Sequence, residues 1–134
     1  MAFEDNGLSI GIETDPQFDL STYQWKFVIL DSSGRGRPSA GAATETTAFV
    51  VQNAPRQGHG ATVMVSGLTK VVAGAPLPVN TEVILEYVSG TDNGKALPLP
   101  VAAGTYRVRG LVLLAAASED DLATIQLVNY YKTV

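Results

Sequence analysis

The chain has 134 residues, which is enough for one domain with a modest core. Its apolar fraction of 46% is ordinary, whereas its charged fraction of 16% is well below the roughly 25% of a typical soluble domain. Surface with few charges often meets another protein, so the composition favours assembly. The net charge of −4 argues against a nucleic-acid partner, because phosphate binding needs clustered Lys and Arg.

Cysteine is absent from the sequence, which excludes a disulfide framework and thiolate metal sites. The first seven residues lack the basic and apolar regions of a secretory signal, and no apolar run reaches the length of a membrane span. We therefore expect a soluble protein, without a membrane partner, that stays where it is made or leaves by another route.

Residues 1–22 form a compositional block in which apolar and acidic residues are interspersed. Two interpretations stay open: a disordered terminus, or an extended N-terminal arm that docks on a neighbouring protein. The arm would bind through its apolar side chains, which are Phe3, Leu8, Ile10, Ile12, Phe18 and Leu20. Residues 23–134 would then be the β domain, and deleting residues 1–22 would leave it folded.

The β domain is predicted to begin with a strand at residues 25–30, which the turn signal at residues 31–34 closes. Residues 34–46 are rich in glycine and small residues, which is typical of a mobile loop. Arg35 and Arg37 in this loop can reach carboxylates on a partner. Residues 47–52 form a second apolar run.

Residues 60–75 are the axis of the predicted domain, because apolar and polar residues alternate from 61 to 73. Val63, Val65 and Val71 point one way, and Met64 and Leu68 point the other. A period of two with β-branched residues predicts a strand packed on one face. A glycine at position 67 allows either a hairpin turn or a sharp bend. The alternation keeps its phase through the glycine, so we favour one bent strand.

Further strands are predicted at residues 81–88, 95–100, 105–116 and 123–131, the second of them short and edge-like. Ser118 and Asp121 also have the spacing of a helix capping box. An internal comparison favours a strand instead, since shifting the sequence by about 62 positions aligns residues 48–65 with residues 110–127. The strand at 61–65 then has its counterpart at 123–127, and the domain divides into two similar halves.

No group of residues indicates catalysis, a cofactor or a metal. His59 is the only histidine and lies between two glycines without a positioned base partner. Residues 34–41 lack the spacing and the lysine of a phosphate-binding loop, and the acidic turns at 92–94 and 119–121 do not fit an EF-hand. We therefore expect a protein that is not an enzyme, with no catalytic, cofactor-binding or metal-binding residues.

The order of the elements carries a family resemblance. An apolar strand ending near Val51, a glycine turn, the axial strand, a strand at 82–88, a second glycine turn, the segment 106–118 and a closing apolar strand follow one another. This arrangement resembles the small capsid decoration (cement) proteins of tailed bacteriophages over roughly residues 24–131. The turns at Asn80-Thr81 and Glu119-Asp120 depart from the pattern of that family.

The resemblance implies an all-β fold, a small β-barrel or β-tulip with an extended N-terminal arm. It also implies a homotrimer on the outer capsid surface of a virion, made in the host cytoplasm. There it would bind the major capsid protein and stabilise the shell by bridging capsid subunits. The alternative is a carbohydrate- or surface-binding β module of a phage fibre or adhesin. In that case exposed aromatic rings would stack on sugars, namely Trp25, Tyr87, Tyr106, Tyr130 and Tyr131.

Overall fold

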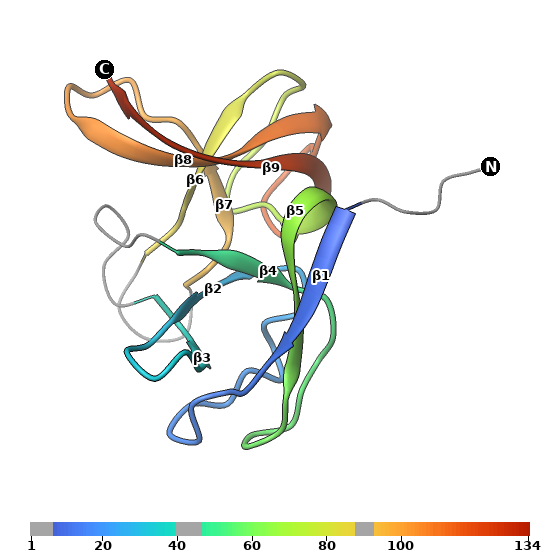
Figure 1. The fold of residues 1–134 in the computed structure, drawn as a ribbon. Coiled ribbons are helices and arrows are strands. Elements are labelled where there is room, and N and C mark those ends of the chain that lie inside the picture. The colour runs from blue at the N-terminus through green and yellow to red at the C-terminus, as the bar shows by residue number, and fades with distance from the viewer. Residues whose placement is uncertain (1–6, 40–46, 88–92) are drawn as a thin grey trace.

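The computed structural model describes residues 7–39, 47–87 and 93–134. This part of the chain is all-β, and its strands form one curled antiparallel sheet shaped like a half-barrel (Figure 1). The predicted all-β, barrel-like fold is therefore confirmed. The strands are β1 (Gly7–Ile12), β2 (Phe27–Leu30), β3 (Gly36–Arg37), β4 (Phe49–Val51), β5 (Ala61–Val72), β6 (Glu82–Leu85), β7 (Ala96–Pro98), β8 (Thr105–Leu114) and β9 (Leu122–Thr133).

Strand β5 is the long element that connects the two lobes of the molecule (Figure 1). It runs without interruption through Gly67, whose φ of 93° lies in the left-handed region that glycine adopts readily. The predicted single bent strand is thus correct, and a hairpin at this position is excluded. The first half of β5 pairs with β1 and β4, and the second half pairs with β9.

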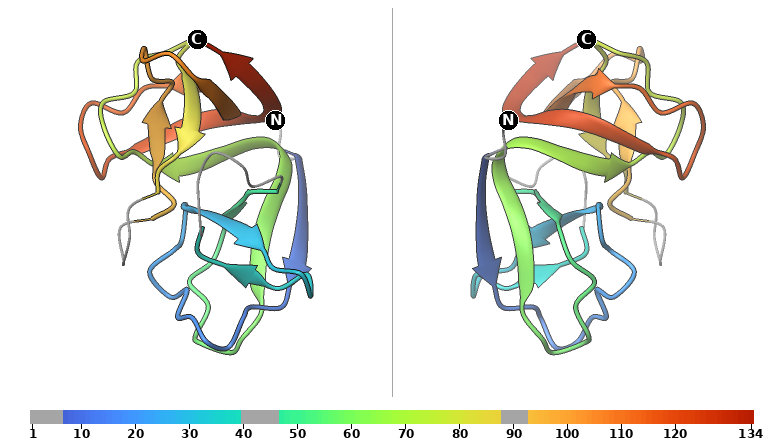
Figure 2. Two further views of the ribbon diagram at one scale, coloured as in Figure 1. Left: turned by 90° about the vertical axis from the view of Figure 1, so that its left-hand side faces the viewer. Right: turned by 90° about the vertical axis from the view of Figure 1, so that its right-hand side faces the viewer.

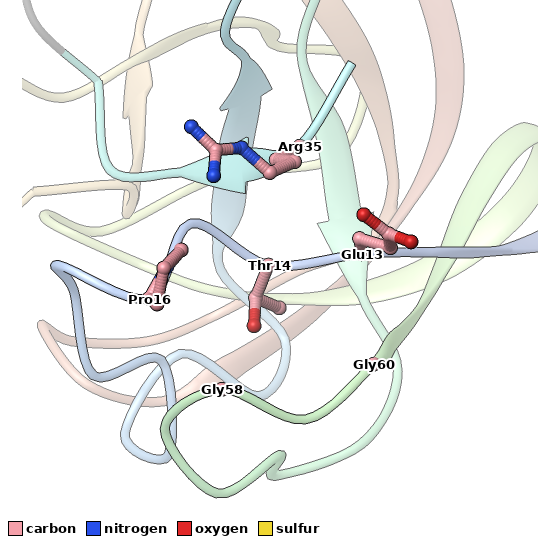
Figure 3. A pocket seen from close by; sticks show the side chains of 6 residues that line it. All are labelled: Glu13, Thr14, Pro16, Arg35, Gly58 and Gly60. Atoms are coloured by element: carbon pink, nitrogen blue, oxygen red, sulfur yellow. The ribbon is translucent and has the colours of Figure 1, made fainter. Parts of the chain in front are cut away.

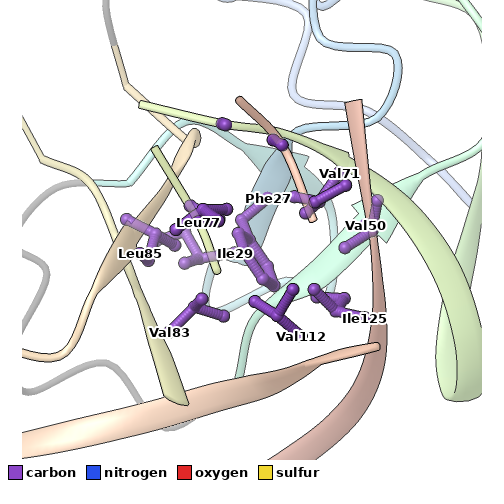
Figure 4. Close-up of a cluster of buried hydrophobic side chains, with 13 residues drawn as sticks. Phe27, Ile29, Val50, Val71, Leu77, Val83, Leu85, Val112 and Ile125 are labelled. Atoms are coloured by element: carbon purple, nitrogen blue, oxygen red, sulfur yellow. The ribbon is translucent and has the colours of Figure 1, made fainter. Parts of the chain in front are cut away.

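Strands β2 and β4 lie between two apolar clusters and are buried on both faces. Phe27, Ile29 and Val50 belong to the larger cluster, which Figure 4 shows with side chains converging from β2, β4, β5, β6, β8 and β9. Val28 and Val51, which alternate with them, belong to the smaller cluster. Burial on both faces explains why these strands are continuous apolar runs in the sequence instead of alternating ones.

The strand order is β3-β2-β4-β5-β9-β8-β6-β7, and β1 pairs with β5 outside this path. From one end the order is β3, β2, β4 and β5, and from the other end it is β7, β6, β8 and β9. Each series begins at a short edge strand and ends at one of the two long central strands. The element after Ser118 is strand β9, so the alternative of a helix there is wrong. The order has the arrangement expected of two similar halves; that the halves superpose remains a prediction.

The structure places most of the predicted arm within the β domain. Residues 7–12 form β1, which pairs with β5 from Gly7 opposite Gly67 to Ile12 opposite Ala61. Leu20 is only 1% exposed and belongs to the smaller apolar cluster. A Cβ atom on Gly7 would lie 2.1 Å from the Ser66 carbonyl oxygen, so only glycine fits this approach to β5. The expectation that residues 1–22 can be deleted without unfolding is therefore corrected, and Phe3 lies outside the described residues.

Candidate interaction surface

The outer face of β5, β8 and β9 carries exposed leucines. Residues that lie opposite each other in an antiparallel pair point to the same side of the sheet. Leu68 lies opposite Gln126, which lies opposite Leu111 on the other side. In the next row, Thr124 of β9 lies between Lys70 of β5 and Leu114 of β8. In the row after that, Leu122 of β9 lies opposite Val72 of β5. We call the surface formed by these leucines the leucine face; its members are Leu68, Leu111, Leu114 and Leu122.

The leucine face is apolar and accessible. Leu114 is 64% exposed and Leu122 is 45% exposed. Two charged residues adjoin the leucines: Lys70, whose amino group lies 5.7 Å from the centroid of the Trp25 ring, and Glu82, which lies opposite Leu111 and is paired with Lys132. Single exposed leucines are ordinary on protein surfaces, whereas neighbouring ones across three strands are typical of an interface.

Two predicted partner-binding residues of β1 are accessible, although they point to different sides of the sheet. Leu8, 58% exposed, lies opposite Ser66, and so it extends the leucine face next to Leu68. Ile10 lies opposite Val63, on the side of the smaller cluster. Leu8 is therefore the residue of the predicted arm whose position agrees best with a role in binding a partner.

The other apolar residues of the predicted arm face the chain's own interior to different degrees. Ile12 is half-buried against the smaller cluster, and Leu20 is a full member of it. Phe18 is half-buried, and the guanidinium of Arg37 lies 4.7 Å from the centroid of its ring. Leu20 is therefore withdrawn as a partner-binding residue, because a side chain inside the core cannot reach another protein.

Arg35 and Arg37 lie beside and within the short strand β3, whereas residues 40–46 of the predicted loop lie outside the described residues. Arg35 precedes β3, and its side chain forms an ion pair at 3.1 Å with Asp31 and a longer one at 3.9 Å with Asp15. The backbone N–H groups of Ser33 and Arg35 also donate to Asp31, and the bond from Arg35 is the main cause of the lowered pKa of that carboxyl. Arg35 thus pairs with carboxylates of its own chain, and the expectation that Arg35 and Arg37 reach carboxylates on a partner stays a prediction.

A surface pocket lies where the segment after β1 meets the loop before β5 (Figure 3). It is lined by Glu13, Thr14, Pro16, Arg35, Gly58 and Gly60. The Thr14 hydroxyl donates to the backbone carbonyl of His59 over 2.6 Å, and this bond fixes one wall. His59 itself lies in an exposed turn. Thr14 is thus occupied in holding two loops together.

Glu82 joins β6 to the C-terminal half of β9. Its carboxylate accepts a hydrogen bond from Tyr130 and an ion pair from Lys132 at 2.6 Å. The bonds from Lys132 and Tyr130 lower the pKa of Glu82, and the same carboxylate raises the pKa of the Tyr130 hydroxyl. These contacts hold the projecting β8–β9 ribbon against the remainder of the sheet.

The aromatic residues considered for sugar binding do not form one platform. Tyr130 points to the outer face with Glu82, whereas Tyr131, the next residue in β9, points to the opposite side and stacks on Arg107 at 4.5 Å. The hydroxyl of Tyr106 donates to the Ala102 carbonyl. This geometry gives no specific support to a carbohydrate-binding module.

Within residues 7–39, 47–87 and 93–134, no group of three or more His, Asp or Glu side chains is placed to hold a metal ion. In the same residues there is no helix with the length and apolar character needed to cross a membrane.

Comparisons of the chain with protein-family models, with curated proteins and with solved structures give no match. The sequence pattern placed Leu68 on the opposite side of the axial strand from Val63, Val65 and Val71, but it did not identify the leucine face. The sequence signal that could have indicated this face was the pair Leu111 and Leu114, in the apolar run that forms β8. Their neighbours in space depend on the register between β8 and β9.

Proposed function

We propose that this chain is a structural, non-enzymatic capsid decoration protein of a tailed bacteriophage. It binds the outside of the shell and stabilises it by bridging subunits of the major capsid protein. The proposed assembly is a homotrimer, as in the family that the sequence resembles. The observation that carries the proposal is the leucine face, because an accessible apolar sheet face extended by Leu8 is suited to adhesion between proteins.

The physics of the task agrees with these residues. A shell under internal pressure fails at contacts between subunits, so a protein that stabilises it must add contact area across them. Several contacts on one bound molecule reinforce each other, because every contact after the first is intramolecular. The leucines themselves have little desolvation cost when they are covered, and the carboxylate of Glu82 at the border of the face is already paired with Lys132.

The direct test measures binding of the purified protein to expanded phage shells that lack it. The expected results are saturable binding and a higher melting temperature of the shells. Leu114→Glu places a charge in the leucine face and should weaken binding. Val101→Glu is the matched control, because Val101 is 96% exposed and lies outside the face. Failure of the wild-type protein to bind would refute the proposed function, and equal binding by Leu114→Glu would refute the role of the leucine face.

A further inference from the structure

Three polar side chains that can donate hydrogen bonds lie among the leucines of the leucine face. Lys70 of β5 lies opposite Thr124 of β9, and Gln126, two residues further along β9, lies on the same side of the sheet. Figure 2 shows this half of β5, in green, beside the first half of β9. The four leucines adjoin these residues in the same row or in the neighbouring rows. We call Lys70, Thr124 and Gln126 the polar strip of the face.

A shallow hollow opens over the polar strip. It is lined by Leu68, Thr69, Lys70 and Thr124. The side chain of Thr69 is buried, and its hydroxyl accepts a hydrogen bond from the Gln52 amide, so Thr69 contributes backbone to the hollow. The ammonium of Lys70 and the hydroxyl of Thr124 are therefore the polar side-chain groups at the hollow, and one bound group can contact both.

The chain itself does not use the polar groups of the strip. In residues 7–39, 47–87 and 93–134, no carboxylate lies within ion-pair distance of the Lys70 ammonium. In the same residues, the side chains of Thr124 and Gln126 have no hydrogen-bond partner. Glu82, the carboxylate at the border of the face, lies three strands away from Lys70 in the sheet and is paired with Lys132. The hydrogen bonds of the strip are thus left for a partner.

Trp25 holds Lys70 in position. The ammonium lies 5.7 Å from the centroid of the indole ring. The backbone of Trp25 has a φ of 65°, which bulky residues rarely adopt, and two strands fix it: its N–H donates to the Val51 carbonyl, and its carbonyl accepts from the Val72 N–H. A ring fixed in this way limits the motion of a long side chain, so less entropy is lost when Lys70 binds.

The apolar surroundings determine the charge of the group that binds. When a partner covers the leucines, the Lys70 ammonium loses its water, and an ammonium without a counter-ion is strongly unfavourable in apolar surroundings. A carboxylate removes this cost, because it only accepts hydrogen bonds and its two oxygens can accept from the ammonium and from the Thr124 hydroxyl at once. The complementary surface is therefore apolar with an acidic residue among its apolar ones.

We infer that the polar strip binds the side-chain carboxylate of an Asp or Glu that the partner carries among apolar residues, with the leucines packed around it. The identity of the partner rests on the proposed function: it is the major capsid protein. A second copy docked face to face supplies no such carboxylate, because Glu82 is already paired and a two-fold contact sets two polar strips against each other. Nucleic-acid phosphates fit poorly, since they are bound by clustered Lys and Arg and the strip has one cation.

The test uses Lys70→Met, which removes the charge but keeps an unbranched side chain, and measures binding to expanded phage shells that lack the protein. On a face that binds by apolar contact alone, this change would strengthen binding or leave it unaltered. A carboxylate that pairs with Lys70 would instead be buried without a partner, so binding should weaken about thirtyfold or more. Lys70 is exposed, so the melting temperature of the variant should equal that of the wild type.

Charge reversal and a double-variant cycle sharpen the test. Lys70→Glu should bind more weakly than Lys70→Met, because like charges then meet. Arg56→Glu is the matched control, since it changes the net charge equally in an exposed loop before β5, and it should bind as the wild type does. Thr124→Val keeps the shape and should weaken binding about tenfold. Combined with Lys70→Met it should cost less than the product of the two effects, because both groups bind one carboxylate.

Three outcomes overturn the inference while the proposed function stands. The first is shell binding by Lys70→Met that is as tight as that of the wild type or tighter. The second is equal weakening by Arg56→Glu and Lys70→Glu, because net charge then decides. The third is self-association of the wild type that Lys70→Met abolishes, because a second copy then covers the strip.

A displayed library of random peptides separates failure of this inference from failure of the proposed function. If the wild-type protein ignores the shells, the proposed function fails. Selection by the wild type of peptides with an acidic residue among apolar ones, lost in Lys70→Met and kept in Arg56→Glu, would still establish the carboxylate site. No such selection and no shell binding would overturn both.

Discussion

Replacing Leu20 by alanine tests whether the N-terminal block belongs to the β domain. Leu20 is 1% exposed and lies in the smaller apolar cluster with Val28, Val51 and Val63, which are each fully buried. Truncation removes its apolar contacts and leaves a cavity between β2, β4 and β5. Buried Leu→Ala changes cost about 2–5 kcal/mol, depending on how far the surrounding strands collapse into the space.

The assay is urea unfolding followed by tryptophan fluorescence, since Trp25 is near the cluster in sequence and is the only tryptophan. A loss of about 3 kcal/mol corresponds to a melting temperature roughly 10 °C lower for a domain of this size. Leu8→Ala is the matched control: the same chemical change at a leucine that is 58% exposed should alter stability by about 0.5 kcal/mol or less. Equal stabilities of Leu20→Ala and Leu8→Ala would refute the placement of Leu20 in the core.

Three further predictions concern single contacts. Because hydrogen bonds in the folded protein lower the pKa of Glu82, the stability they provide is present at neutral pH and is lost as pH falls below about 4. Glu82→Gln should therefore lose less stability than the wild type between neutral and acid urea titrations; an unchanged acid loss would contradict this. Gly67→Ala should cost about 1–2 kcal/mol in thermal unfolding, since alanine is strained at a φ of 93°; a stabilised variant would show that the bend does not need glycine. Asp31→Ala should destabilise more than Arg35→Ala in the same assay, because Asp31 also accepts the backbone N–H groups of its turn; the reverse order would show that the ion pair dominates.

The strands predicted best are those whose burial is visible as a local pattern. Strand β5 alternates with one phase on both sides of Gly67, so both its extent and its bend could be predicted. Strands β2 and β4 are buried on both faces and were found as apolar runs. In each case the sequence contains the signal within a few adjacent residues.

Strand β1 and Leu20 could not be assigned in the same way. Glycines interrupt the alternation of β1, and its residues are mostly exposed because it pairs with β5 at an edge. Leu20 lies between acidic and polar residues, and its neighbours in the cluster are distant in sequence. An exposed edge strand and a single buried leucine resemble an arm until the pairing with β5 is known.

The surface was harder to predict than the fold, for a related reason. Leu68, Leu114 and Leu122 become neighbours only through the registers of β5 with β9 and of β9 with β8. The second register contains shifts between Val112 and Leu114, which no local rule specifies. Arg35 is a partial exception, since Asp31 lies four residues before it, whereas Asp15 comes close only in the fold.

Strand β9 is divided between two environments. Its first half lies in the leucine face, between β5 and β8, and its second half pairs with β8 alone. The bend at Gly67 produces this division, because β5 turns away from β9 where its pairing with β9 ends at Leu68. The bend therefore limits the leucine face to the first half of β9, since the leucines of three strands are neighbours only where β5, β9 and β8 lie side by side.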